Sequence, residues 1–97
     1  NLNGASYKLY NRVMEQAVSE VKIGRLLKKY WRVRVPRKFR EGTSEALIEI
    51  EGERWLVELD KHGRVYIPVK LRPSIEKAKT IIIRREGSTI VLKPRPY

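Results

Sequence analysis

The sequence of 97 residues contains no cysteine and no long apolar run. The absence of cysteine excludes disulfide bonds, cysteine-based zinc sites and thiol catalysis, and makes an intracellular setting the simplest expectation. Because no apolar run could span a bilayer or serve as a signal segment, we expect a soluble, cytoplasmic chain with no membrane partner. Phe and Trp are few, with one Phe and two Trp, so Val, Ile and Leu must supply most of one modest core.

Residues suited to catalysis or metal binding are also scarce. His62 is the single histidine, and without a second imidazole or a thiol it is better interpreted as a turn residue beside Asp60. No nucleophile–base pair, glycine-rich phosphate loop or converging carboxylates are visible. We therefore expect no enzymatic activity, no metal, no cofactor and no small-molecule substrate.

Acidic residues are outnumbered, with 11 Asp and Glu against 22 Lys and Arg and a net charge of +11. Residues 21–40 carry nine basic and no acidic side chains, 41–60 carry one basic and seven acidic, and 61–97 carry ten basic and two acidic. A solubilising surface usually mixes both signs, so the unmixed block favours a polyanionic partner such as nucleic acid. Scarce Gln and Asn beside abundant Arg, Lys, Glu and Ile are also typical of proteins from hot environments.

The pattern of apolar residues changes along the first forty positions. A spacing of three and four residues predicts a helix from Tyr7 to Glu20, for packing or dimerisation. A period of two then predicts a strand over 21–27, with Gly24 as a bulge, followed by a turn over 28–31. A basic strand follows and should end at Pro36, because proline cannot donate to a sheet ladder. Tyr30 and Trp31 in the turn are expected to cap the core rather than to stack on bases.

The rest of the chain reads as two hairpins separated by a basic strand. The first hairpin, over 46–59, turns near Gly52, and the second, over 80–94, turns near Gly87. Between them we predict a turn around His62–Gly63, a strand to Pro68 and a short helix from Pro73. The outward glutamates of the first hairpin have two interpretations, a solvated face or a site for a basic partner, including another copy of the chain.

An internal repeat is the most informative feature of the sequence. The segment WRVRVPRKFR at 31–40 aligns with GRVYIPVKLR at 63–72, with five identical positions and two similar ones. Each segment then leads into a hairpin. Duplication of a unit made of a basic strand, a proline, a short helix and a hairpin explains both similarities.

The second copy carries a family resemblance. VELDKHGRVYIPVKLR, followed by IIIRREGSTIVLKP, closely resembles the AbrB family of swapped-hairpin transcription factors, whose MraZ-like members hold both halves in one chain. The matching positions are Leu59, Asp60, Gly63, Arg64, Ile67, Pro68, Leu71 and Arg72 at the opening, and Ile90, Leu92, Lys93 and Pro94 at the close. The first copy lacks the Asp and Gly of the turn.

The resemblance implies a mainly β (α+β) fold, a swapped-hairpin pseudo-barrel with an N-terminal helix. The expected organisation is an N-terminal helix over 1–20, a first, degenerate half over 21–55, a second half over 56–94 and a tail over 95–97. The strand ending at Leu59 would close the first half and open the second.

A basic face for DNA follows from the resemblance and from the parity of the strands. The resemblance implies that Arg64 and Arg72 stand at the family's DNA-contacting positions, and that Arg32 and Arg40 are their counterparts in the first half. Arg25 fills a further basic position on the family's first strand. The predicted DNA-binding face comprises Arg25, Arg32, Arg34, Lys38, Arg40, Lys61, Arg64, Lys70 and Arg72. Guanidinium groups suit phosphates and guanine edges, and closely spaced cations gain affinity by releasing counterions. Tyr66 either touches a base or sugar or packs across the strands.

These observations predict a sequence-specific or architectural DNA-binding protein, a nucleoid-associated transcription regulator that binds double-stranded DNA as a homodimer or higher homo-oligomer. The alternative is a protein-interaction module, either a VapB-like antitoxin or a structural component of a larger assembly. An antitoxin would have to use its N-terminal helix, because only three residues follow Pro94. RNA binding is a third alternative.

Overall fold

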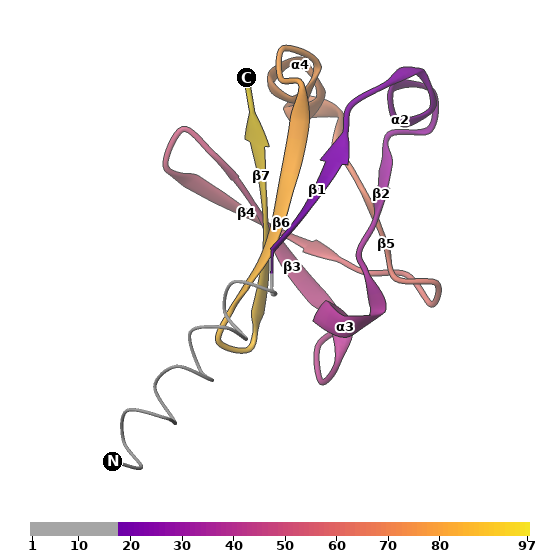
Figure 1. Cartoon of the computed structure of the whole chain (residues 1–97), viewed down its shortest axis with the longest axis vertical. Helices are drawn as coiled ribbons and strands as arrows, with labels where there is room; N and C mark the ends of the chain where they lie inside the picture. The colour runs from indigo at the N-terminus through magenta and orange to yellow at the C-terminus, as the bar shows by residue number, and fades with distance from the viewer. Residues whose placement is uncertain (1–17) are drawn as a thin grey trace, which may run out of the picture.

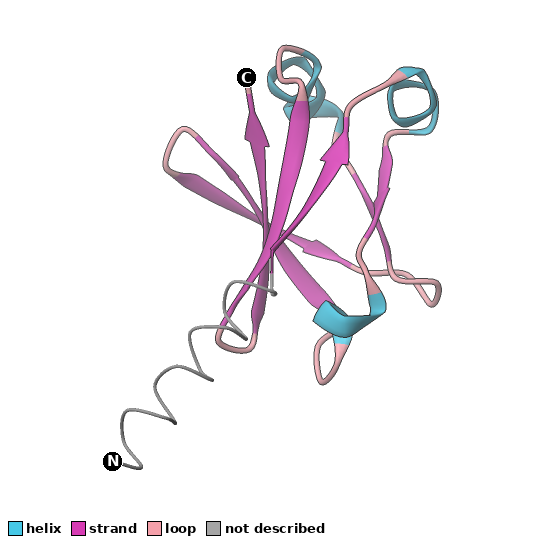
Figure 2. Cartoon of the chain, viewed as in Figure 1, coloured by secondary structure: helices cyan, strands magenta, loops and turns pink. Residues whose placement is uncertain are grey.

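A computed structural model describes residues 18–97, which form a mainly β fold in two layers (Figures 1 and 2). A mixed five-stranded sheet has the order β1-β6-β7-β3-β4, and a two-stranded ribbon pairs β2 with β5. The elements are β1 (Val18–Lys22), α2 (Arg25–Tyr30), β2 (Arg32–Arg34), α3 (Arg37–Arg40), β3 (Glu45–Ile50), β4 (Glu53–Glu58), β5 (Arg64–Tyr66), the 3-10 turn η1 (Val69–Leu71), α4 (Arg72–Glu76), β6 (Thr80–Glu86) and β7 (Thr89–Arg95).

The start of the described chain differs from the prediction. Residues 18–20 belong to β1, which pairs antiparallel with β6, so the predicted helix is wrong at its C-terminal end. The earlier part of that helix lies outside the described residues. The extended conformation of β1 is stabilised by pairing with a strand some sixty positions away. A local pattern of apolar residues carries no information about such a distant partner.

The predicted strand over 21–27 and the turn over 28–31 are also wrong. β1 ends at Lys22, and the helical turn α2 occupies Arg25–Tyr30, with Gly24 before it as the N-cap rather than as a bulge. Leu27 is the buried residue of this helix. The apolar residues that suggested an alternating strand therefore do not all face the core. Leu and Lys, which dominate α2, are good helix formers.

Both predicted hairpins are confirmed, with the registers that their alternating patterns require. β3 and β4 pair antiparallel from Glu45 opposite Glu58 to Ile50 opposite Glu53, and β6 and β7 pair over their full lengths. Gly52 and Gly87 have positive φ angles, which suits the tight turns that join the arms. Pro94 lies in β7 opposite Ile81, near the end of that pairing.

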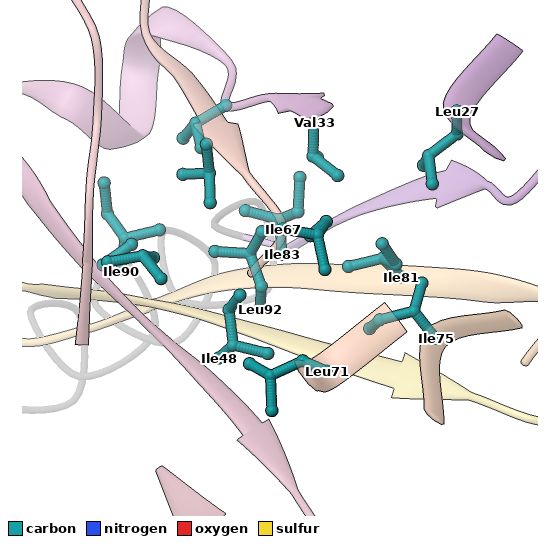
Figure 3. Close-up of a cluster of buried hydrophobic side chains, with 14 of the residues drawn as sticks. Leu27, Val33, Ile48, Ile67, Leu71, Ile75, Ile81, Ile83, Ile90 and Leu92 are labelled. Atoms are coloured by element: carbon teal, nitrogen blue, oxygen red, sulfur yellow. The ribbon is translucent and has the colours of Figure 1, made fainter. Parts of the chain in front are cut away.

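The core lies between the five-stranded sheet and the ribbon. Aliphatic side chains from the inner sheet face meet those of the ribbon and of the short helices (Figure 3). The labelled residues of this cluster are Leu27, Val33, Ile48, Ile67, Leu71, Ile75, Ile81, Ile83, Ile90 and Leu92. Phe39 is the one phenylalanine and is 1% exposed, so the short helix α3 is held by a large apolar anchor.

The two repeated segments adopt the same backbone conformation through the proline and a similar helical turn after it, α-helical in the first and 3-10 in the second. Pro36 has φ −55° and ψ 142°, and Pro68 has φ −56° and ψ 143°. Three residues after each proline, the N–H of Phe39 or Leu71 donates to the proline carbonyl at 2.9 Å. Each proline thus ends a basic strand and begins a turn. The turn places one apolar side chain, Phe39 or Leu71, in the core, where both are buried.

The two halves hold each other through reciprocal backbone contacts. Trp31 and Gly63, equivalent in the repeat, both have positive φ angles. The carbonyl of Gly63 accepts the N–H of Val35 at 2.8 Å, and the carbonyl of Trp31 accepts the N–H of Ile67 at 2.7 Å. The turn before each basic strand thus accepts a hydrogen bond from the residue just after the other basic strand. Val33 and Val65 lie opposite each other at the centre of the ribbon.

Strands of the two halves are also interleaved in the larger sheet. β3, from the first repeat unit, pairs in parallel with β7 from the second, and β1 pairs with β6. β4 is the second arm of the first hairpin and leads through a bridge between Leu59 and Val65 into β5. A single chain therefore joins both units into one core.

Gly63 should be the least replaceable glycine among the described residues. Its φ is +77°, and a Cβ atom there would overlap the guanidinium and Cδ of Arg40. We expect Gly63→Ala to cost more than about 2 kcal/mol of unfolding free energy, since the left-handed strain alone costs roughly 1–2 kcal/mol. Urea denaturation monitored by circular dichroism measures the loss.

Gly87→Ala is the matched control. Gly87 also has a positive φ, +64°, but nothing lies within 4 Å of the position that a Cβ atom would take there. Gly87→Ala should lower the unfolding free energy by only about 1 kcal/mol. In an Arg40→Ala background the cost of Gly63→Ala should fall to that of Gly87→Ala. Equal losses for the two glycines in the wild-type background would contradict the steric explanation.

Candidate nucleic-acid interface

The outer face of the ribbon gathers the basic residues of both repeated segments. Alternation along β2 and β5 turns Val33 and Val65 inward, where they are 1% and 0% exposed. The remaining residues of the two strands project outward, away from the core. These residues, Arg32, Arg34, Arg64 and Tyr66, are called the cationic ladder below.

Two arginines lie directly opposite each other in the cationic ladder. The register pairs Arg34 with Arg64 and Arg32 with Tyr66. Like charges at opposed positions of an antiparallel pair destabilise a sheet, because their Cβ atoms are only about 5 Å apart. No ion pair joins Arg34 to another of residues 18–97. An external anion would relieve this repulsion.

Asp60 organises the turn that leads into β5. Its Oδ1 accepts the backbone N–H of His62 at 2.8 Å and that of Arg64 at 2.9 Å, and its Oδ2 accepts Nε of Arg64 at 3.0 Å. The backbone hydrogen bond from Arg64, followed by the bonds from its side chain and from His62, lowers the pKa of Asp60 to about 2. The carboxylate is therefore ionised at neutral pH and fixes the direction of the Arg64 side chain.

Arg32, the counterpart of Arg64, has a different neighbour. Its guanidinium carbon lies 4.7 Å from the centroid of the Tyr30 ring, and Nζ of Lys29 lies 5.3 Å from the same ring. Tyr30 is 47% exposed, so this contact sits at the surface. A cation–π contact positions the arginine without cancelling its charge. Trp31 packs against the core, as predicted, whereas the same prediction is wrong for Tyr30, whose ring is exposed and lies outside the core cluster.

Arg40 and Arg72 lie against the turns of the opposite half. The Arg40 side chain lies under Gly63, and its Nε is buried without a hydrogen-bond partner among the described residues. Arg72 donates from Nε to the carbonyl of Ile67 at 3.1 Å and stacks 5.4 Å from the Trp31 ring. Both are half-buried, and they support the ends of the ribbon rather than extend the cationic ladder.

The other predicted residues lie around the ends of the ribbon. Because β2 and β5 are antiparallel, Lys38 in α3 and Lys61 in the turn before β5 lie at one end, and Arg25 in α2 lies toward the other. All three are exposed, and Figure 1 shows α2 and α3 near the two ends of β2. Lys70 differs, since its Nζ lies 4.0 Å from the Trp55 ring on β4. The ribbon thus brings together three of the nine predicted residues, Arg32, Arg34 and Arg64.

The outer face of the five-stranded sheet, on the far side of the core, mixes charges of both signs. Glu49 pairs with Arg54 at 2.9 Å, Lys93 at 3.5 Å and Arg84 at 3.8 Å. Glu86 pairs with Arg84 at 2.9 Å and with Arg54 at 3.2 Å. Hydrogen bonds from these arginines lower the pKa of both glutamates. Such a network is typical of a solvated surface and contrasts with the cationic ladder.

Other kinds of site find little support in the described part of the chain. No cluster of three or more acidic or histidine side chains suited to a metal ion occurs within residues 18–97. In the same part of the chain, the helices are too short and too polar to cross a membrane. Comparison of the chain with family models, curated proteins and solved structures finds no match.

Two residues of the interface were not among the predicted site residues. Asp60 and Tyr30 each hold one arginine of the cationic ladder, the first by an ion pair and the second by its ring. The signal for Asp60 was its spacing of four residues before Arg64 across a glycine turn. No comparable signal exists for Tyr30, since its contact depends on the left-handed bend at Trp31.

The depressed pKa of Asp60 makes part of the stability depend on pH. A carboxyl group whose pKa is lower in the folded chain than its usual 3.8 stabilises the fold above about pH 4, and this contribution is lost as the pH falls toward about 2. We expect Asp60→Asn to be less stable than wild type at pH 6 and to approach it near pH 2. Thermal unfolding at the two pH values measures the difference, and a gap of constant size would contradict this role.

Proposed function

We propose that the chain binds double-stranded DNA through the cationic ladder and acts as a regulator or architectural factor of the AbrB-like, swapped-hairpin kind. The observation that carries the proposal is the opposed pair Arg34 and Arg64, with Arg32 beside them on the same exposed face. Asp60 balances Arg64 alone, and no ion pair within residues 18–97 balances Arg34 or Arg32. A polyanion supplies the missing negative charge from outside.

The shape of the ribbon supports a duplex as the polyanion. The major groove of B-DNA is about 12 Å wide and admits a two-stranded β-ribbon. Three residues per strand, at about 3.3 Å each, give a ribbon roughly 10 Å long. Such a ribbon can approach one groove, and the lysines at one of its ends, Lys38 and Lys61, would then approach the flanking phosphates.

The interleaved topology supports binding by one chain. Both repeated segments meet in the ribbon of a single molecule, so both rows of basic residues are present without a second copy. Arg40 and Arg72 contribute indirectly in this proposal. By supporting the turns at Gly63 and Trp31, they hold the ends of the two basic strands in place.

Affinity for a duplex should fall steeply with salt, because binding through phosphates releases counterions. For about four phosphate contacts, the association constant should fall roughly a hundredfold between about 50 and 200 mM monovalent salt. Fluorescence anisotropy with a labelled random-sequence duplex measures the slope. An affinity that does not change over this range would overturn an electrostatic interface.

Removing two ladder arginines should abolish most of this affinity. We expect Arg32→Ala plus Arg34→Ala to weaken duplex binding about a hundredfold at low salt, on the order of 1.4 kcal/mol per arginine. The matched control is Arg54→Ala plus Arg95→Ala, which removes the same charge from other parts of the molecule, where both arginines pair with glutamates. Circular dichroism checks the fold of both variants.

The control separates a defined interface from a general attraction of a basic chain. Equal losses in both double variants would mean that net charge alone, and not the cationic ladder, drives binding. Failure of the wild-type chain to bind any duplex, with its fold intact, would favour the protein-interaction alternative. Binding of single-stranded or duplex RNA in preference to DNA would assign the same face to RNA.

A further inference from the structure

The basic strands of the two halves share a backbone conformation but differ in charge, and the residues before them differ in both, since Lys28 and Lys29 lie in α2 and Asp60 and Lys61 in a turn. With the 32-residue offset of the repeat, Lys28 corresponds to Asp60, Lys29 to Lys61, Arg32 to Arg64, and Arg34 to Tyr66. The first half therefore presents four cations. The second presents two cations and one carboxylate, so the apparent symmetry of the ribbon does not extend to its electrostatics.

The equivalence of the two arginines is structural and not only a matter of alignment. Arg32 and Arg64 each open a three-residue strand, and each directly follows a residue with a positive φ angle, Trp31 or Gly63. The antiparallel register then places Arg32 opposite Tyr66 and Arg64 opposite Arg34. A difference in the behaviour of the two arginines must therefore come from their neighbours.

The neighbours treat the two guanidinium groups differently. Asp60 forms an ion pair with Nε of Arg64 at 3.0 Å, with both side chains about one quarter exposed. Arg32 lies over the neutral ring of Tyr30, 4.7 Å from its centroid. No ion pair joins Lys28, Arg32 or Arg34 to another of the described residues.

We infer that the first half supplies most of the affinity for DNA phosphates and that Asp60 weakens the second half, so the two strands of the ribbon hold the duplex unequally. This inference rests on the proposed function. A phosphate that approaches Arg64 meets a guanidinium already shared with a carboxylate, whose charge repels it. A phosphate that approaches Arg32 meets a cation with no internal anion, and releases a bound counterion when it binds.

Asp60 has a second effect, which is to orient Arg64. The ion pair and the backbone hydrogen bonds from His62 and Arg64 hold one carboxylate at the start of β5. An arginine held in one direction loses less side-chain freedom when it meets a fixed partner than an arginine that moves freely. Asp60 is thus a positioning residue, and it makes the second half weaker in affinity but more defined in geometry.

A set of six proteins tests the inference. Arg32→Gln and Arg64→Gln are each made in the wild-type background and in Asp60→Asn, and the association constant and its salt slope are measured on one labelled random-sequence duplex. In the wild-type background, we expect Arg32→Gln to weaken binding about tenfold and to reduce the salt slope by about one. Arg64→Gln should weaken it only about twofold, with little change in slope.

Removing the Asp60 carboxylate should make the contributions of Arg32 and Arg64 to DNA affinity equal. We expect Asp60→Asn to bind the duplex several-fold more tightly than wild type, since it removes a negative charge from the interface. Its side-chain oxygen can still accept the two backbone hydrogen bonds of the turn. In this background, Arg64→Gln should cost about tenfold, as Arg32→Gln does, and should reduce the salt slope by about one.

The outcomes separate this inference from the proposed function. Equal costs for Arg32→Gln and Arg64→Gln in the wild-type background would overturn the inference, while leaving DNA binding through the cationic ladder in place. A cost of Arg64→Gln that does not rise when Asp60 is replaced would also overturn it. Absence of any duplex binding by the wild-type chain would overturn the proposed function itself. If Asp60→Asn unfolds, Asp60→Ser, whose hydroxyl can also accept a turn hydrogen bond, takes its place.

Discussion

The reciprocal hydrogen bonds from Val35 to Gly63 and from Ile67 to Trp31 are the contacts on which the rest of the structure depends. They join the end of each basic strand to the turn before the other, and so fix the register with Val33 opposite Val65. A shift of one residue would turn these valines to solvent and the arginines into the core. Burying an unpaired guanidinium costs several kcal/mol, so the register is strongly selected.

The same register determines the electrostatics of the surface. It places Arg34 opposite Arg64 and leaves the outer side of the ribbon almost free of acids, whereas the glutamates gather with their partners on the outer face of the five-stranded sheet. Charge is thus separated across the core by the topology. The glutamates of the sheet do not neutralise the ladder, because exposed charges on opposite faces of a domain are largely screened in salt.

The sequence allows the prediction of those parts of the fold that short-range signals determine. Glycine turns at Gly52 and Gly87 and the alternation beside them gave both hairpins, and the prolines gave the ends of both basic strands. The predictions failed before Trp31, where the conformation of β1 depends on pairing with β6 and the helical turn α2 replaces the expected strand and turn. Parity identified the outward arginines of the ribbon, but the positions of Arg40 and Arg72 depend on turns of the other half, which no local pattern records.

The central place of β7 has a consequence for how this chain folds. β7 follows every other described strand in the sequence, yet it lies between β6 and β3 and makes the parallel pairing that joins the two halves of the sheet. Until β7 is available, the sheet consists of two separate pairs, β1 with β6 and β3 with β4. During synthesis, the apolar face of the first half therefore stays uncovered until β7, the last of the described strands, has been made. Pairing over such long sequence separations is slow, which makes this delay the period when the chain is most open to aggregation.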